Sequence, residues 1–401
     1  MKPSEIFRPG VAWRVFFLSI LVWGVGTGCF AAALNNFLSD IYSMDSVGRG
    51  WLEFFREFPG LILVVLFALL HRVSDWRILR LGTMISMVGA ALMLVPANQF
   101  YVTGFIMVWS LGEHVIMPPR QVIAMEVAQP QHAGQSLGFM TSIMNFGAVA
   151  GSLIVALIFF LGTRWTALSQ RALFNVVWAT VAILILVSIL CTFVVKVPET
   201  RARRPKLYFN RKFNKFYALE LFYGARKQIF ITFAPYVLIR VYGFSTAFMA
   251  LLLGICAAVN ILVAPLVGKL TDKVGYRNIM IWDTIVLCFV CILYGFARNI
   301  FPAKVALAVV CVNFLLDAII STTALANNIY LREISSSQDE LASSMSTGIS
   351  INHFISIAVG PIGGLIWARH GIGVLFSIAA VMAVCNSLFA YTLPRPQNSE
   401  K

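Results

Sequence analysis

Residues 268–277 have the sequence Gly-Lys-Leu-Thr-Asp-Lys-Val-Gly-Tyr-Arg and connect two long apolar runs, 245–268 and 279–297. A similar connection, His-Arg-Val-Ser-Asp-Trp-Arg-Ile-Leu-Arg, occupies residues 71–80 in the first half of the chain. The later connection follows the eighth apolar run and the earlier one follows the second. Both are short turns in which an aspartate is flanked by basic residues. This recurrence at matching places predicts an internal repeat.

The chain has the composition of a membrane protein. Of its 401 residues, 59% are hydrophobic and only 12% are charged, whereas soluble domains have roughly 25% charged residues. Apolar runs of this length suffice to cross a hydrocarbon core of roughly 30 Å as helices. The first run is too long for a cleaved signal peptide and lacks its cleavage site, so we interpret it as a retained span. We therefore predict an all-α membrane protein of about twelve transmembrane helices, at residues 13–38, 49–71, 79–96, 100–126, 134–162, 172–196, 216–241, 245–268, 279–297, 303–331, 342–368 and 371–393.

The basic residues predict the topology. The net charge of +14 is concentrated in alternate loops, and this positive-inside bias places both termini in the cytoplasm. The membrane would be the plasma membrane, or the inner membrane of a bacterium. The largest cluster comprises Lys196, Arg201, Arg203, Arg204, Lys206, Arg211, Lys212 and Lys215. We interpret it as an anchor at anionic headgroups rather than a nucleic-acid site.

The basic cluster also divides the chain near its middle. We predict an N-terminal six-helix bundle at 1–196, a basic cytoplasmic linker at 197–215 and a C-terminal six-helix bundle at 216–401. Small residues four apart recur at matching places, at Gly147 and Gly151 in the fifth span and at Gly360 and Gly364 in the eleventh. Such spacing favours close helix packing.

These features resemble the major facilitator superfamily. The stretch 268–277 fits its signature loop, G-x-L-[AT]-D-[KR]-x-G-x-[KR], at the expected place after the eighth span. The earlier copy is degenerate, since His71 and Ile78 replace glycines, and residues 198–201 (Pro-Glu-Thr-Arg) are similar to a weaker family feature. The resemblance implies a conformational-switch loop made of Asp75, Arg80, Gly268, Asp272, Gly275 and Arg277.

The resemblance further implies two pseudo-symmetric six-helix bundles around a central cavity, which open alternately to either side. Spans 1, 4, 7 and 10 would line the cavity, 2, 5, 8 and 11 would form the bundle interface, and the others would face outward. The charges agree with this layout, because spans 3, 6 and 12 carry none away from their ends and span 9 carries only Asp283.

Ionisable residues inside spans are the candidate functional groups, because burying them in hydrocarbon costs a few kcal/mol or more. A desolvated carboxylate binds protons more readily, so alternating exposure could load and release one. The proton-coupling candidates are Glu113, His114, Asp317 and Glu57. Glu57 shares a helix face with Glu53 and Arg56, and the alternative there is a purely structural ion pair. A structural pair with a neighbouring basic residue is likewise the alternative for Glu113.

The substrate-binding candidates are Arg226, Lys227, Arg56, Asn328, His353 and Asn145. Arg226 presents a fork suited to carboxylate or phosphate, whereas Lys227 is a mobile point charge. Two adjacent cations at mid-membrane suggest an anionic or zwitterionic solute. The alternative is that they pair with Glu57, Glu113 or Asp317. The two side chains point roughly 100° apart, and either one could face the cavity.

We therefore expect a secondary transporter of a small organic anion or zwitterion, coupled to protons or another ion and functional as a monomer in the lipid bilayer. The alternative is a multidrug or amphiphile exporter, favoured by 13% aromatic residues and 14 methionines. A non-transporting sensor is disfavoured because no loop is long enough for a soluble domain. No enzyme, cofactor, metal or nucleic-acid role is expected, since the five histidines are dispersed and no phosphate-binding loop occurs.

Overall fold

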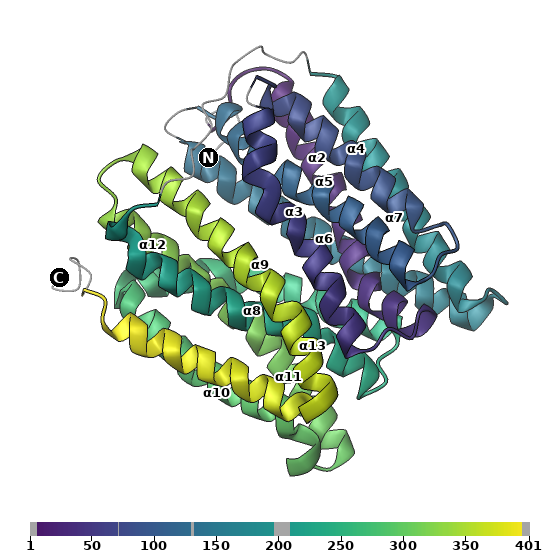
Figure 1. Ribbon diagram of the computed structural model, residues 1–401. Helices are drawn as coiled ribbons and strands as arrows, with labels where there is room; N and C mark the ends of the chain where they lie inside the picture. Colours follow the sequence, from purple (N-terminus) through teal and green to yellow (C-terminus); the bar gives the residue numbers. More distant parts are fainter. Residues whose placement is uncertain (1–5, 71, 130–131, 196–208, 395–401) are drawn as a thin grey trace. The chain divides into compact units, whose positions relative to one another are not determined.

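The computed structural model describes residues 6–70, 72–129, 132–195 and 209–394 (Figure 1). These residues are almost entirely helical, and their one isolated β-bridge joins Phe7 to Ala128. His71, the 198–201 motif and the first part of the basic cluster, Lys196 to Lys206, lie outside the described residues. The predicted all-α fold is confirmed.

The helices follow the predicted spans closely. The first half contains α2 (Ala12–Asn36, extended by a π-helical turn, Phe37–Ile41), α3 (Ser46–Leu69), α4 (Asp75–Leu92), α5 (Gln99–Glu126), α6 (Ala133–Trp165) and α7 (Gln170–Phe193). The second half contains α8 (Asn214–Arg240), α9 (Thr246–Val274), α10 (Tyr276–Ile300), α11 (Ala303–Ser321), α12 (Leu325–Ile334) and α13 (Gln338–Tyr391).

Three spans differ from separate straight helices. The tenth is divided into α11 and α12 by a 3-10 turn, Thr322–Ala324. The eleventh and twelfth are joined as α13, which bends at Gly371, where φ is +82°. Glycine is favoured there because it lacks the Cβ that disfavours this backbone conformation in other residues. With α11 and α12 counted together and α13 counted as two, the described helices correspond to the twelve predicted spans.

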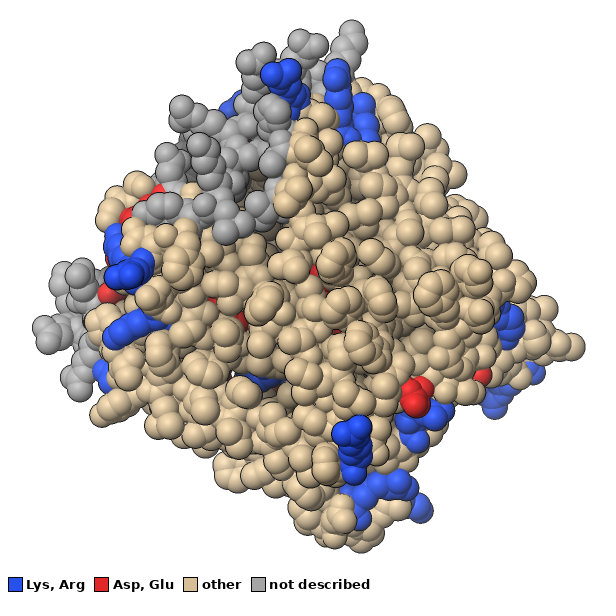
Figure 2. Space-filling view, viewed as in Figure 1, with Lys and Arg blue, Asp and Glu red and all other residues tan. Residues whose placement is uncertain are grey.

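The outer surface suits a lipid environment. Eight helical stretches within the described residues are long and apolar enough to cross a membrane. Large apolar side chains are exposed, among them Phe100 (79%), Leu69 (74%) and Leu262 (71%). On the face drawn in Figure 2, most of the surface is uncharged and lysine and arginine gather toward its margins. The protein is therefore a multi-pass integral membrane protein.

The chain forms two compact units. The first comprises Met1–Ser43, Ile62–Arg204 and Phe244–Ala258, and the second comprises Met44–Leu61, Pro205–Gly243 and Val259–Lys401. Two helices are divided between them, because the first part of α3 belongs to the second unit and the first part of α9 belongs to the first unit. The division into 1–196, 197–215 and 216–401 stays a prediction.

Two arginines of the predicted switch loop hold the ends of helices. Within the first unit, Arg80 donates to the carbonyl oxygens of Thr192 (2.5 Å) and Val195 (3.0 Å) at the end of α7. Within the second unit, Arg277 donates to the carbonyl oxygen of Tyr391 (2.8 Å) at the end of α13. The last carbonyls of a helix lack internal partners, and a cation there is favourable. The third and ninth spans thus supply matching arginines that cap the ends of the sixth and twelfth spans, which supports the internal repeat.

The small-residue motifs bring helices into close contact. In the first unit, a Cβ on Gly147 would lie 2.7 Å from the backbone of Gly24 in α2. In the second unit, a Cβ on Gly360 would lie 2.7 Å from the carbonyl oxygen of Gly50 in α3. Neither contact leaves room for a larger side chain, so glycine permits this backbone approach.

The start of α13 is capped by polar side chains. Ser337 Oγ accepts a hydrogen bond from the Glu340 N–H (3.1 Å), as an N-cap residue does. The Glu340 carboxylate accepts from the Ser336 N–H (2.7 Å) and from Lys212 Nζ (2.9 Å). These hydrogen bonds, first that of Ser336 and then that of Lys212, lower the pKa of Glu340.

This lowered pKa predicts a pH-dependent contribution to stability. The unfolded carboxyl group has a pKa of about 4.3, so the stabilisation is fully present above that pH and is lost as the pH falls through the lower, folded-state pKa. We expect wild type to melt above Glu340→Gln by a constant margin at neutral pH and by a vanishing margin in acid. Thermal melts of the purified proteins at stepped pH measure this margin. A margin that does not change in acid would contradict the assignment.

Candidate functional site

A row of buried charges lies along the first part of α3, in the second unit. This α3 charge row consists of Arg49, Glu53, Arg56 and Glu57. Glu53 is fully buried and pairs with Arg49, which is 2% exposed. Arg56 donates from Nε to Glu53 (2.8 Å) and from Nη2 to Glu57 (2.6 Å). Gln228 of α8 donates to Glu53 Oε2 (2.9 Å), the same oxygen that accepts from Arg56. The predicted shared face of Glu53, Arg56 and Glu57 is therefore present.

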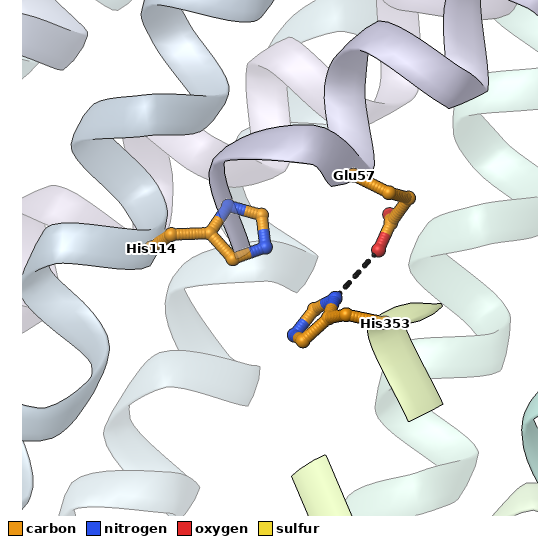
Figure 3. A group of neighbouring side chains, drawn as sticks. All are labelled: Glu57, His114 and His353. Atoms are coloured by element: carbon orange, nitrogen blue, oxygen red, sulfur yellow. Dashed lines mark hydrogen bonds and ion pairs between the residues drawn. The ribbon is translucent and has the colours of Figure 1, made fainter. Parts of the chain in front are cut away.

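The charge row ends in a hydrogen bond between α3 and α13 (Figure 3). His353 Nδ1 lies 2.8 Å from Glu57 Oε2. An ionised carboxylate only accepts hydrogen bonds, so Nδ1 carries the proton in this contact. Both side chains are largely buried, with Glu57 8% and His353 14% exposed. Two proton-binding groups thus connect two helices that are far apart in sequence.

A second polar group connects α8, α12 and α13. Lys227 Nζ donates to Asn352 Oδ1 (2.9 Å), and Asn352 Nδ2 donates to Glu220 Oε2 (3.4 Å). The other Glu220 oxygen accepts from Asn327 Nδ2 (3.0 Å). The carboxamide of Asn352 therefore bridges a lysine and a glutamate on the same helix. We call this group the amide bridge.

Arg226 has a different environment from its neighbour Lys227. It is 4% exposed and its guanidinium lies 5.1 Å from the centre of the Tyr223 ring. The carboxylates of Asp317 in α11 and Asp283 in α10 attract its charge. Asp283 also accepts a hydrogen bond from Thr323 (2.7 Å). Arg226 is therefore buried in the field of two carboxylates of the second unit, whereas Lys227 is half-buried beside the amide bridge.

The first unit contributes a smaller charged group on α5. Glu113 is half-buried, and its charge interacts with Arg120, seven residues further along the helix. His114 is 6% exposed, and its Nδ1 lies 2.8 Å from the Ser110 carbonyl oxygen. Asn145 is half-buried in α6. The electrostatic interaction with Arg120 is compatible with both roles considered for Glu113, a structural pair with a basic residue and a proton-coupling group.

The remaining switch-loop residues lie at the starts and ends of helices. Asp75 is buried in the first turn of α4. Gly268 and Asp272 lie in α9, and the side chain of Asp272 lies outside the described residues. Gly275 has a φ of +85° and precedes the first residue of α10. That backbone conformation is why glycine occupies this turn.

Sequence reasoning missed several members of these groups. Arg49 is the first residue of the predicted span 49–71 and was not a candidate, although its four-residue spacing from Glu53 is the usual signal of a helical ion pair. Glu220 was not a candidate either. Asn328 is exposed, and the adjacent Asn327 makes the contact with Glu220. Neighbouring helix positions point roughly 100° apart, so composition alone could not choose between the two asparagines.

Comparison with known proteins supplies the family. The sequence profile of the Major Facilitator Superfamily matches residues 16–329. This chain belongs to that superfamily. Membership points to a transporter rather than an enzyme, and transporters of this kind bind small-molecule substrates in a membrane. No curated protein matches its sequence.

Solved structures of other transporters share the superfamily fold. A mutant of the nucleoside transporter NupG has a TM-score of 0.76 at 13% identity, covering 95% of this chain and 99% of NupG. The xylose transporter XylE from E. coli has a TM-score of 0.74 at 15% identity, covering 96% of each chain. A mutant of the peptide transporter POT in complex with sulfate has a TM-score of 0.73 at 11% identity, covering 97% of each chain. At such identities the likeness shows the fold alone.

Proposed function

We propose that this superfamily member is a secondary active transporter that carries a small organic anion or zwitterion by alternating access, coupled to protons. The observation that carries the proposal is the hydrogen bond between His353 and Glu57 inside the spans. Protonating the Glu57 carboxylate removes the charge of the acceptor in this contact. Proton binding would thereby weaken a direct contact between α3 and α13, which is what coupling between protons and helix movement requires.

The candidate residues for proton coupling and for substrate binding differ in how well the structure supports them. Glu57 has the best support as a coupling group, and Glu113, His114 and Asp317 remain candidates. Among the substrate-binding candidates, Lys227 has more support than Arg226, because two carboxylates already attract Arg226. We also propose that both termini are cytoplasmic and that the protein works as a monomer in the plasma membrane, or the inner membrane of a bacterium.

Uptake into proteoliposomes tests the proposal. A panel of organic anions, zwitterions and cationic amphiphiles is offered with and without an inward proton gradient. We expect an anion or zwitterion to accumulate only with the gradient. Glu57→Gln is expected to abolish this accumulation while it retains exchange of labelled for unlabelled solute, because exchange requires no net proton movement.

Glu340→Gln, which changes a partly buried carboxylate at the start of α13, outside the predicted spans, is the matched control and should accumulate solute like wild type. Equal accumulation of solute with and without the proton gradient would refute proton coupling. Flux of cationic amphiphiles alone would favour the exporter alternative. Failure of every solute to move would refute the transport proposal for this chain.

A further inference from the structure

The amide bridge has the polarity of a bound zwitterion. The Asn352 carboxamide presents a donor to the carboxylate of Glu220 and an acceptor to the ammonium of Lys227. The headgroup of an α-amino acid has the same polarity, because its ammonium donates to a carboxylate and its own carboxylate accepts from a cation. The donor and acceptor atoms are separated by one carbon in the amide and by two in the amino acid. An α-amino acid headgroup thus nearly matches the spacing of the amide.

The bridge is built so that one of its bonds breaks easily. The contact between Asn352 and Glu220 is 3.4 Å long, near the limit of a hydrogen bond, while Asn327 holds the other carboxylate oxygen at 3.0 Å. Glu220 therefore stays oriented when Asn352 turns away. A ligand ammonium could then form a shorter, charge-assisted bond with the freed oxygen.

The interruption of the tenth span lies beside the same group. Asn327 stands near the start of α12, just after the 3-10 turn, Thr322–Ala324, that separates α11 from α12. Interrupted membrane helices often form the binding sites of transporters, because irregular backbone at membrane depth is tolerated where it lines a cavity. This observation points to a ligand site independently of the hydrogen bonds.

The balance of charge favours a zwitterion over a simple anion. The group contains one carboxylate, Glu220, and one cation, Lys227, and the Asn352 carboxamide contacts both. An anion that bound Lys227 would leave Glu220 without its nearby positive charge. A zwitterion brings its own ammonium, so both groups remain compensated.

We propose that Glu220 and Lys227 bind the ammonium and the carboxylate of an α-amino acid headgroup, and that Asn352 occupies this place when the ligand is absent. The proposal rests on the transport function proposed above and narrows its substrate class. Asn327 acts as a positioning residue that keeps the Glu220 carboxylate aimed at the ammonium.

Ligand-induced thermal stabilisation of the purified protein tests this assignment. Each of the twenty protein amino acids is titrated first, and the best is compared with its 2-hydroxy acid, which lacks the ammonium, and with its amide, which lacks the carboxylate. For wild type we expect the amino acid to bind roughly tenfold or more tightly than either analogue, because each analogue leaves a buried charge unpaired. In Glu220→Gln, the amino acid should bind no more tightly than its 2-hydroxy acid. In Lys227→Met, the amino acid should bind no more tightly than its amide.

These different changes in ligand preference would show that Glu220 and Lys227 contact the ligand. If the two residues had only a structural role, their replacement would weaken binding of all three compounds equally. Lys304→Met, at an exposed lysine in α11, is the control and should bind like wild type. Stabilisation by no amino acid, or equal loss of all three compounds in both variants, would overturn the proposal. If another solute then accumulates with a proton gradient, the transport function stands without this site. If amino acids bind as described but never cross the membrane, the site stands and the transport function fails.

Discussion

Replacing Arg49 by methionine is expected to destabilise the protein by about 3–5 kcal/mol, the usual cost of removing one partner of a buried ion pair. Glu53 is fully buried and Arg49 is 2% exposed, so water cannot compensate for the missing charge. Arg56 and Gln228 still contact Glu53 in this variant, but Arg56 is shared with Glu57 and Gln228 carries no charge. Unfolding in SDS, followed by circular dichroism, measures the loss of unfolding free energy.

The double variant Arg49→Met with Glu53→Gln provides the control. Replacement of a whole buried pair by neutral groups is often nearly neutral for stability, so we expect the second change to restore most of the loss. A double variant as unstable as Arg49→Met would show that the loss comes from packing of the arginine stem and not from the stranded carboxylate.

Replacing Gly360 by leucine is expected to separate the first part of α3 from α13. The first added carbon alone would lie 2.7 Å from the carbonyl oxygen of Gly50, and such overpacking costs about 1–3 kcal/mol. If transport passes through this packed state, its rate falls by roughly 5- to 150-fold. Hydrogen exchange followed by mass spectrometry should show faster exchange in residues 46–61 than in wild type.

Gly104→Leu is the matched control, because no atom lies within 4 Å of a Cβ placed at Gly104 in α5. It should leave exchange in residues 46–61 unchanged. Unaltered exchange in Gly360→Leu would mean that the contact between α3 and α13 contributes little to holding this conformation.

Much of the fold is predictable because its signals are local in the chain. An apolar run predicts a membrane span whatever its helix packs against. The predicted tenth span, 303–331, corresponds to α11 and α12 even though a turn divides them. The loop at 268–277 identified the superfamily because its residues serve a turn, and Gly275 has the positive φ that the turn demands. The bend in α13 at Gly371 falls where Arg369 and His370 separate two predicted spans, 342–368 and 371–393.

The candidate site was only partly predictable. Glu53, Arg56 and Glu57 were placed on one face because three- and four-residue spacing fixes neighbours within a helix. Their partners Gln228 and His353 lie on other helices, and helix spacing says nothing about them. Arg226 and Lys227 looked equivalent in sequence, yet one lies among carboxylates and the other at the amide bridge.

The sequence alone determined that this chain is a helical membrane protein of the major facilitator superfamily with ionisable groups inside its spans. These properties follow from hydropathy, loop charge and one turn motif, all of which are read along the chain. Only the tertiary structure decided which charges meet, that Asn327 rather than Asn328 holds Glu220, and that Asn352 connects Glu220 with Lys227. Those contacts depend on how one helix is rotated and shifted along its axis relative to another. Close packing at glycines sets this arrangement, and the sequence of a single helix does not encode it.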